Sequence, residues 1–532
     1  MSPDHTLGAE APASPAGASP AGASPAGAST ARASAVNAAS AIAAPGVEAP
    51  RAAPGARVGQ PDSEALTVRL AGPRCSAAAA LLAADALLVI FVWPLAVMLI
   101  GDAIPAGVPP GPLPLVLYPA AFLLFLYALG LYRRDALIEP GRAIGRVPLA
   151  AGLGSASAFA AVTLLPPPFA APGASALFGA AVLAFTASAL AARGVFFLAQ
   201  RRGAFRSSLL VVGAGKRAWD MVWLLSREGR TITQDVAFVH DPRMGEIDPR
   251  LAEDKRWPIF PASDGFLAIA RRVRADRIVV APDERRGMPM TELLSCRTAG
   301  FPVHEYHRFL EREIGRVDLK RLDIGSLLYA DGFTFSVIDL ALKRALDIAA
   351  SAGMLLITAP FLAAAALAVK LDDGGPVLYR QARVTRGGRV FRIMKLRTMT
   401  VDAERGGAVW AAKQDPRVTR IGRFLRRTRL DELPQLFNVL AGDMSFVGPR
   451  PERPEFTTEL AAALPLYNER HLVRAGLTGW AQVNYPYGAS LDDARSKLSY
   501  DLYYVKNFSV IFDVLIILQT LRVVLWPGGG VR

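Results

Sequence analysis

The sequence predicts a membrane protein with three folded parts: a bundle of four membrane helices, an α/β module with a parallel sheet, and an α-rich monotopic domain with a re-entrant membrane helix. Hydrophobic residues make up 52% of the 532 residues and the mean hydropathy is +0.28, which is high for a soluble protein. The formal net charge is +14, and arginines gather beside apolar stretches. This pattern favours an anionic membrane surface or an anionic substrate over nucleic acid.

The first 65 residues are rich in Ala, Pro, Gly and Ser, with a short repeat between Ala13 and Ser29. Because they offer no periodic apolar face to bury, we expect a disordered arm at 1–65. A basic start followed by an apolar core is missing, so we expect no secretory signal peptide.

A membrane region of four helices is predicted over 66–205. Its apolar stretches each approach the ~20 residues that a spanning helix needs, and they lie near 76–100, 113–132, 148–165 and 174–200. Arginines flank the bundle ends and the middle loop, whereas the loops at 101–112 and 166–173 contain no Lys or Arg. The positive-inside rule therefore places both ends of the bundle in the cytoplasm and disfavours four buried helices of a soluble core.

An α/β pattern follows over 206–330, with strand-like runs near 208–212, 236–239 and 277–281. This predicts a Rossmann-like module. Gly213 and Gly215 supply two glycines of a dinucleotide fingerprint, but Trp219 follows and no acidic residue is well placed for a ribose. We therefore favour a structural or regulatory module over an active cofactor site.

The apolar run at 341–371 begins the last domain, predicted over 331–532. It is long enough to span, but spanning would carry an arginine-dense stretch, 380–429, across the membrane. Pro360 lies within the run, where it removes a helical hydrogen bond, and Thr358 offers a nearby hydroxyl. We predict a broken, re-entrant helix with both ends cytoplasmic; a kinked spanning helix is the alternative.

The concentrated polar signals lie beyond residue 371. Two arginine-rich runs, 380–397 and 417–429, lead directly into Asp431 and Glu432. Arginine forks grip phosphate oxygens, and a carboxylate among them can hold a divalent cation. Surrounding arginines are expected to keep Asp431 ionised, as a nucleophile requires. On spacing alone, an N-cap carboxylate followed by a solvated glutamate is an equal alternative.

Local sequence places this pair at a bend. Pro434 suits the first turn of a helix, and the residue before it, Leu433, is expected to be non-helical. Arg450 lies in a Gly-Pro-Arg-Pro turn that suits a fixed phosphate contact, or simply a surface turn. Cys75 and Cys296 are the only cysteines, and the five histidines are not clustered, so neither a disulfide framework nor a cysteine metal cluster is expected.

Several short motifs combine over about 341–526: Lys343-Arg344 with Asp347, Pro360, Lys395-Leu-Arg397-Thr-Met, Arg429-Leu-Asp431-Glu432-Leu-Pro-Gln-Leu-Phe-Asn438, Gly442-Asp443-Met-Ser-Phe-Val-Gly-Pro-Arg450-Pro, Leu477-Thr-Gly-Trp-Ala-Gln482 and Tyr500-Asp-Leu-Tyr-Tyr-Val-Lys506-Asn. Together they resemble the bacterial sugar transferase family, the polyprenyl-phosphate hexose-1-phosphate transferases. The four-helix start and α/β insert are similar to long members such as undecaprenyl-phosphate glucose phosphotransferases. Two further motifs, Pro451-Glu-Arg-Pro-Glu-Phe456 and Asn484-Tyr-Pro-Tyr-Gly-Ala-Ser490, resemble an exopolysaccharide branch associated with exosortases. One departure is Ala475, where the family usually has proline.

The resemblance implies transfer of a hexose-1-phosphate from a UDP-sugar to undecaprenyl (polyprenyl) phosphate, with release of UMP. Asp431 would form a covalent phosphosugar intermediate and bind Mg²⁺, and Glu432 would assist it. The residues expected to hold substrate phosphates are Arg426, Arg450, Lys395 and Arg397. Those expected at the membrane and the lipid phosphate are Lys343, Arg344, Asp347 and Pro360.

The same resemblance implies the initiating step of exopolysaccharide biosynthesis at the bacterial inner membrane, with the catalytic domain on the cytoplasmic side. The expected partners are UDP-sugar, polyprenyl phosphate and membrane lipids, with no nucleic acid; a homodimer is left open. A nucleotide-sugar dehydratase or epimerase would need a Tyr-x-x-x-Lys pair that 207–330 lacks. A transporter or scaffold is disfavoured because the four helices offer little polar lining beyond Asp85.

Overall fold

The computed structural model of the chain describes residues 76–100, 112–164, 174–229, 233–320, 332–401, 403, 415–486, 488 and 490–525. The arm predicted at 1–65 and most of the two loops without Lys or Arg, 101–112 and 166–173, lie outside these residues.

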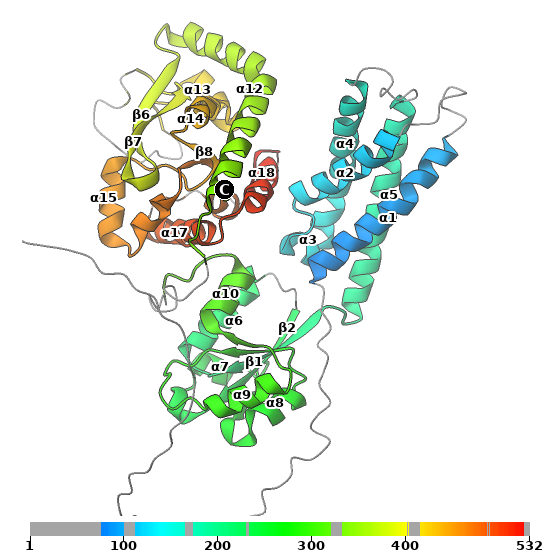
Figure 1. The fold of residues 1–532 in the computed structure, drawn as a ribbon, viewed down its shortest axis with the longest axis vertical. Helices are drawn as coiled ribbons and strands as arrows, with labels where there is room; N and C mark the ends of the chain where they lie inside the picture. The colour runs from blue at the N-terminus through cyan, green and yellow to red at the C-terminus, as the bar shows by residue number, and fades with distance from the viewer. Residues whose placement is uncertain are drawn as a thin grey trace, which may run out of the picture. The chain divides into compact units, whose positions relative to one another are not determined.

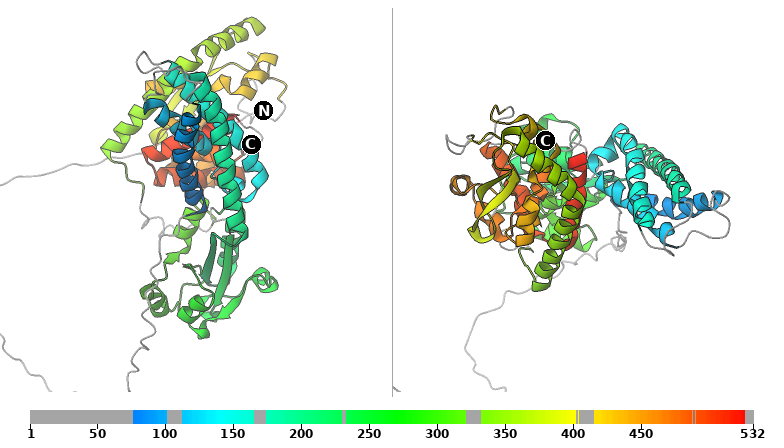
Figure 2. Two further views of the ribbon diagram at one scale, coloured as in Figure 1. Left: turned by 90° about the vertical axis from the view of Figure 1, so that its right-hand side faces the viewer. Right: turned by 90° about the horizontal axis from the view of Figure 1, so that it is seen from above.

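The first described part is a helical bundle, seen from three directions in Figures 1 and 2. Its helices are α1 (Ala77–Leu99), α2 (Pro112–Ala128), the short α3 (Arg134–Ile138), α4 (Pro140–Thr163) and α5 (Ala174–Arg201). α1 packs on α5, and α4 packs on both α2 and α5. Stacked aromatic rings fill the interior, among them Trp93, Tyr118, Phe122 and Phe185.

Not all four long helices of this bundle are equally suited to a membrane. By length and composition, α1 and the 176–201 part of α5 could cross one; the apolar part of α2, 113–128, is shorter, and α4 is not among the candidates. Inside the bundle Arg193 forms a 2.7 Å ion pair with Asp85, which also accepts a 2.8 Å hydrogen bond from Tyr132. This pairing satisfies a buried charge that would otherwise be costly in an apolar setting.

The second part is a five-stranded parallel sheet, which confirms the predicted α/β pattern. The strands β1 (Arg206–Val212), β2 (Thr233–His240), β3 (Ile259–Pro261), β4 (Arg277–Val280) and β5 (Val303–Glu305) lie in the order β3-β2-β1-β4-β5. One apolar cluster joins the sheet to α6 (Lys216–Glu228) and α10 (Tyr306–Ile314), and another joins it to α8 (Phe266–Arg272) and α9 (Met290–Thr298). Helices on both faces make this a doubly wound fold.

The third part begins with α12 (Val337–Asp373) and a hairpin of β6 (Leu378–Val384) and β7 (Val390–Leu396). Its further elements are α13 (Arg420–Thr428), the 3₁₀ turn η6 (Leu430–Glu432), α14 (Gln435–Ala441), β8 (Ser445–Val447), α15 (Pro454–Ala463), η7 (Tyr467–Leu472), β9 (Gly476–Thr478), α16 (Trp480–Asn484), α17 (Leu491–Lys506) and α18 (Val510–Leu525). β8 and β9 pair in parallel, and an apolar cluster around them packs on α17 and α18.

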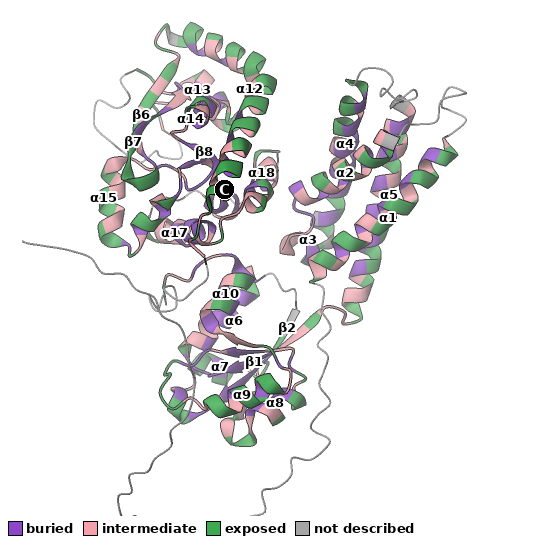
Figure 3. Ribbon diagram, in the orientation of Figure 1, coloured by how far each residue is buried: buried purple, intermediate pink, exposed green. Residues whose placement is uncertain are grey.

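α12 is a single helix of 37 residues with Pro360 inside it, and Figure 1 shows that it changes direction along its length. The Thr358 hydroxyl donates a 2.7 Å bond to the Met354 carbonyl, six residues before the proline. Most of the surface of α12 is exposed, as Figure 3 shows, and only 11% of its most apolar stretch of 18 residues is buried. The helix is therefore long and apolar enough for a membrane, and it is continuous through Pro360 rather than broken there.

Candidate active site

Two basic residues converge on Glu432 from distant parts of the sequence. Lys395 lies near the end of β7, and Arg450 follows β8 in the Gly-Pro-Arg-Pro turn. Glu432 Oε1 accepts bonds from Lys395 Nζ at 3.1 Å and from Arg450 Nη2 at 2.8 Å. Arg450 also donates to Gln482 Oε1 at 3.3 Å. These contacts fix the direction of both cations around one carboxylate.

Asp431 has very different surroundings from its neighbour. Its side chain is buried, and Oδ1 has no hydrogen-bond partner among the described residues. Burial and the charge of Glu432 raise the pKa of Asp431 to about 6, against the opposing effects of Lys395, Arg426 and Arg429. The arginines therefore lower this pKa as expected, but desolvation outweighs them. The carboxylate remains mostly ionised at neutral pH and keeps an oxygen uncommitted.

Glu432 is shifted in the opposite direction. Although burial raises its pKa, the charges and hydrogen bonds of Arg450 and Lys395 outweigh that effect and hold the pKa well below its usual range. For Lys395, burial lowers the pKa while Glu432 raises it. Glu432 is therefore a fixed anion that organises cations, whereas Asp431 is the less stabilised and more reactive of the two carboxylates.

The backbone around the pair differs from the predicted bend. Leu433 has helical angles, φ −56° and ψ −35°, so the expectation that it is non-helical was wrong. Together with Pro434, which also has helical angles, it links the end of η6 to the start of α14. The sharp turn instead lies at Arg429, which adopts a left-handed φ of 61° between α13 and η6. A non-glycine residue in this region is strained, and such residues cluster at functional sites.

Three close contacts hold α13 and the segments before and after the β6–β7 hairpin in place. A Cβ on Gly422 of α13 would overlap the Thr398 carbonyl, so only glycine lets this helix approach the end of β7. There Arg426 Nε donates to Thr398 Oγ1 at 2.9 Å. Arg397 is buried and donates from Nε to the Pro376 carbonyl at 2.8 Å.

Asn438 ties α14 to β7. Its side chain accepts from Met394 N at 2.9 Å and donates to the Arg392 carbonyl at 2.9 Å, next to Lys395 in the strand. Both bonds imitate a strand partner, so they fix β7 relative to the helix that follows Glu432.

Sequence reasoning overlooked a second layer behind Arg450. Arg470 is buried and donates to the Arg450 carbonyl at 3.0 Å, to Asp501 Oδ2 at 2.8 Å and to the Tyr467 hydroxyl at 2.8 Å. No local signal in the sequence marks this network, since Arg470 and Asp501 lie on separate elements. Gln482 belonged to a quoted motif, but was not among the expected site residues.

The residues expected at the lipid phosphate do not form one group. Lys343 is buried, donating to the Val447 carbonyl at 3.0 Å and to Asp513 Oδ2 at 2.7 Å. Asp347 is also buried and accepts from Ser445 Oγ and Phe446 N, both at 2.9 Å. These contacts anchor the start of α12 to β8 and α18.

Arg344 and Pro360 have other positions along α12. Arg344 donates to the carbonyls of Val439 and Leu440 at 2.6 and 2.7 Å, at the end of α14, whereas Pro360 is exposed on the apolar helix. The lipid-phosphate role of the four residues stays a prediction; the geometry gives Lys343 and Asp347 a structural one.

Most arginines of the first predicted run, 380–397, are distributed over the two strands and the turn of the β6–β7 hairpin. Arg389 pairs with Asp443 at 2.8 Å and Arg383 lies 3.7 Å from Glu452, whereas Arg386 is in the turn between β6 and β7. The run therefore does not form one continuous phosphate-binding face.

The comparisons with known proteins match the part of the chain that builds this site. A sequence model described as "Bacterial sugar transferase" matches residues 338–527. The exopolysaccharide production protein PSS of Rhizobium leguminosarum bv. phaseoli is 44% identical over 198 residues, which are 36% of this chain and 99% of that protein. The chain belongs to the bacterial sugar transferase family.

Two further members of the family carry names that specify a reaction. The UDP-N-acetylgalactosamine-undecaprenyl-phosphate N-acetylgalactosaminephosphotransferase of Aeromonas hydrophila is 42% identical over 49% of this chain and 61% of its own length. The UDP-glucose:undecaprenyl-phosphate glucose-1-phosphate transferase of Escherichia coli is 43% identical over 34% of this chain and 39% of its own. This chain thus spans about three fifths of the first of these relatives and less of the second.

Ala475, the departure from the family pattern, has a structural explanation in this sugar transferase. Its backbone N–H donates to Thr385 Oγ1 at 3.1 Å, and its carbonyl accepts from Ser445 N at 2.8 Å. A proline has no N–H to donate. The segment is therefore held by a hydrogen bond to the β6–β7 turn in place of a proline ring.

The α/β module offers a second candidate site, at Gly213 and Gly215. There Asp283 accepts bonds from the backbone N–H groups of Lys216 at 2.7 Å and Arg217 at 2.8 Å, at the start of α6. A dinucleotide phosphate would use these same donors. Because a carboxylate of the chain already takes them, the geometry favours the structural or regulatory reading of the module.

Proposed function

We propose that this sugar transferase moves a hexose-1-phosphate from a UDP-sugar to undecaprenyl phosphate, releasing UMP, through a phosphosugar bound covalently to Asp431. The observation that carries this proposal is the contrast within the carboxylate pair. Asp431 is buried with an uncommitted Oδ1, while Glu432 is held by Lys395 and Arg450. Covalent catalysis needs one reactive carboxylate inside a fixed cationic frame.

In the first step an oxygen of Asp431 attacks the phosphorus that bears the sugar. The bond between that phosphorus and the bridging oxygen of the diphosphate breaks, and its electron pair leaves with UMP. Lys395, Arg426 and Arg450 surround the carboxylates and supply positive charge where the phosphate oxygens collect negative charge. Their fixed contacts reduce the reorganisation needed during reaction.

In the second step an oxygen of undecaprenyl phosphate attacks the same phosphorus and Asp431 leaves as a carboxylate. The product is undecaprenyl diphosphate carrying the sugar. Dividing the transfer allows one carboxylate to serve a water-soluble donor and a lipid acceptor in turn. In the relatives' names the donors are UDP-glucose and UDP-N-acetylgalactosamine, so both are reasonable donors to test.

The site also fits Mg²⁺, with Asp431 as the protein ligand. Its Oδ1 is an orphaned buried acceptor, and Mg²⁺ typically binds through one or two carboxylates together with waters and substrate phosphates. A site of this kind needs no cluster of three acidic or histidine ligands, and none occurs among the described residues. Bound there, the ion would neutralise charge on the diphosphate and the leaving UMP.

We further propose that the catalytic domain lies on the cytoplasmic side of the bacterial inner membrane and begins exopolysaccharide synthesis there. α12 would enter and leave through the same leaflet, with its bend at Pro360. The exposed apolar surface of α12 supports membrane entry, and the basic segment after it argues against crossing.

The decisive experiment separates the two half-reactions. Purified protein, a UDP-sugar labelled in the sugar and Mg²⁺, without lipid acceptor, should yield UMP and a labelled protein whose label maps to Asp431. Undecaprenyl phosphate should then discharge the label. Asp492→Asn, an exposed carboxylate at the start of α17, is the matched control. Full UMP release by Asp431→Asn would overturn the proposal.

A further inference from the structure

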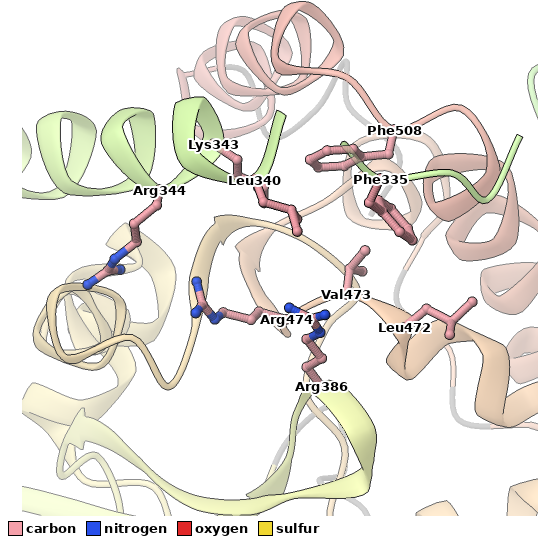
Figure 4. Close-up of a pocket in the computed structure, with 9 residues that line it drawn as sticks. All are labelled: Phe335, Leu340, Lys343, Arg344, Arg386, Leu472, Val473, Arg474 and Phe508. Carbon is pink, nitrogen blue, oxygen red and sulfur yellow. The ribbon is translucent and has the colours of Figure 1, made fainter. Parts of the chain in front are cut away.

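A basic pocket lies at the start of α12, away from the carboxylate pair. It has a volume of about 160 Å³, and Figure 4 shows its lining residues, which are Phe335, Leu340, Lys343, Arg344, Arg386, Leu472, Val473, Arg474 and Phe508. Arginines gather on one side of the pocket, while Phe335, Phe508 and Leu472 lie on the other. The pocket is therefore amphipathic.

The charges of the pocket are incompletely balanced. Lys343 is paired with Asp513, but within the described part of the chain neither Arg386 nor Arg474 forms a hydrogen bond or ion pair through its guanidinium group. Arg344 donates to two backbone carbonyls, which cancel no charge.

The electrostatic setting of Arg474 agrees with this imbalance. Burial lowers the pKa of the Arg474 guanidinium, and so do the positive charges of its neighbours Arg344, Arg386 and Arg389. The negative charge of Asp347 acts in the opposite direction and raises it. Asp347 already accepts bonds from Ser445 and Phe446. The arginines thus repel one another, and a phosphate placed among them would relieve the repulsion with bidentate hydrogen bonds.

The apolar side faces the part of the protein suited to a membrane. Phe335 and Phe508 pack edge to face with ring centroids 5.4 Å apart, and Leu472 is 40% exposed. The first turn of α12 beside them exposes Val337 and Ile338 by 84% and 70%. A hydrocarbon chain leaving the pocket would therefore meet apolar surface.

The pocket is separated from the reacting carboxylates by the length of α14. Arg344 binds the last carbonyls of that helix, whereas Asp431 and Glu432 precede its first residue. Seven residues at 1.5 Å each span roughly 10 Å. A phosphorus atom that must reach Asp431 cannot rest among Arg344, Arg386 and Arg474 at the same time.

We propose that this pocket binds the phosphate headgroup of an anionic membrane phospholipid, with its acyl chains along Phe335, Phe508 and the start of α12. The bound lipid would seat the catalytic domain on the membrane through the Arg344–Arg386–Arg474 cluster. This inference goes beyond the proposed transfer reaction and needs only the membrane setting of α12, because it assigns no step at Asp431.

The test uses the full-length protein in nanodiscs of phosphatidylcholine with and without phosphatidylglycerol. Retained lipid is measured by native mass spectrometry, and phosphatidylglycerol affinity by titration of the thermal melting shift. The double variant Arg386→Gln with Arg474→Gln should bind phosphatidylglycerol at least roughly tenfold more weakly, as for the loss of charged hydrogen bonds. Arg389→Gln removes one charge from the same hairpin but leaves the three pocket arginines in place, and should weaken phosphatidylglycerol binding far less than the double variant does.

Three other results would refute the phospholipid site or assign the pocket to a different ligand. Unchanged phosphatidylglycerol binding by the double variant would refute the proposal, as would equal stabilisation of the protein by inorganic phosphate alone. Displacement of phosphatidylglycerol by undecaprenyl phosphate, with loss of label discharge in the variant, would make this the acceptor site instead. Arg386 is exposed in a turn, so Arg386→Gln alone keeps the test valid if the double variant folds poorly. Since lipid binding is measured without turnover, a failed transfer assay leaves this result readable.

Discussion

Asp431 and Glu432 are consecutive carboxylates whose pKa values are shifted in opposite directions. Burial is the main cause that raises the pKa of Asp431 from an ordinary 3.8 to about 6. The charges and hydrogen bonds of Arg450 and Lys395 hold the pKa of Glu432 well below its usual value. Adjacent positions therefore hold one carboxylate whose charge is disfavoured by burial and one whose charge is stabilised by its basic partners. Three of the following predictions concern this pair and its supports.

Replacing Asp431 should move activity and stability in opposite directions. Asp431→Asn removes the nucleophile, so UMP release should fall by about 10³-fold or more. In the unmodified protein the pKa of Asp431 is higher in the folded state than in the unfolded state. Ionisation of Asp431 therefore opposes folding increasingly between pH 3.8 and 6 and fully above pH 6. The variant should therefore gain up to roughly 3 kcal/mol at pH 7.5 in metal-free buffer, which thermal melting would report. A lower melting temperature than that of the unmodified protein would contradict this reasoning.

Replacing Glu432 should instead destabilise the protein. Glu432→Gln leaves Lys395 and Arg450 facing each other without their shared anion, at a cost of about 1.5–3 kcal/mol. Because the folded pKa of Glu432 is depressed, its stabilisation is present above the unfolded pKa and is lost as the pH falls through the folded one. The melting difference between the two proteins should shrink as the pH is lowered below the usual glutamate range. A difference that is constant from neutral to acid pH would rule out this account.

Arg470 is expected to position Arg450. Arg470→Lys keeps the charge beside Asp501 but cannot make all three hydrogen bonds of the arginine, to the Arg450 carbonyl, Asp501 and Tyr467. UMP release should drop roughly tenfold to a hundredfold, as when a catalytic group is slightly misplaced, in protein that still melts cooperatively. Arg495→Lys, whose half-buried side chain pairs with the exposed Asp492 on α17, is the control. Equal activity of both variants would show that the Arg450 turn needs no support from Arg470.

The α/β module should tolerate change at its closed phosphate position. Gly215→Val is a poor test, because a Cβ there would overlap the Asp283 carboxylate. Asp283→Asn keeps the shape, and we expect UMP release within about twofold of the unmodified protein, since surface changes away from special features are usually nearly neutral. In the unmodified protein, NAD⁺ and NADP⁺ should not raise the melting temperature. A nucleotide-dependent gain of activity would instead reveal a regulatory site.

Single cysteines at the two ends of α12 would separate a re-entrant from a spanning helix. Ile338→Cys and Asp372→Cys occupy exposed positions, in a background lacking Cys75 and Cys296. In intact spheroplasts neither should react with an impermeant thiol reagent, and both should react once the membrane is opened. Labelling of one site alone in intact cells would show that α12 crosses the membrane. Pro360→Ala should straighten the helix and shift part of the population in that direction.

The sequence by itself determined the features that depend on local chemistry. Apolar length marked α1, α5 and α12 as candidate membrane helices, and the change to short apolar runs marked the parallel sheet. The acidic pair was recognisable as a candidate site because the arginine-rich run changes abruptly to two adjacent carboxylates, although spacing alone left a capping role equally open. These signals are carried by residues close together in the chain, where periodicity and spacing are readable.

The tertiary structure decided which of those residues meet. Lys395 and Arg450 lie 37 and 18 residues from Glu432, and nothing in their local sequence marks a shared partner. Packing made buried anchors of Lys343 and Asp347, whose lipid-phosphate role stays a prediction. It also placed Asp283 at the backbone N–H groups that a dinucleotide phosphate would use. The physical reason is that a charged side chain takes whichever partner the packed backbone brings within about 3 Å. Burial, which only packing creates, then sets whether its charge is stabilised or penalised.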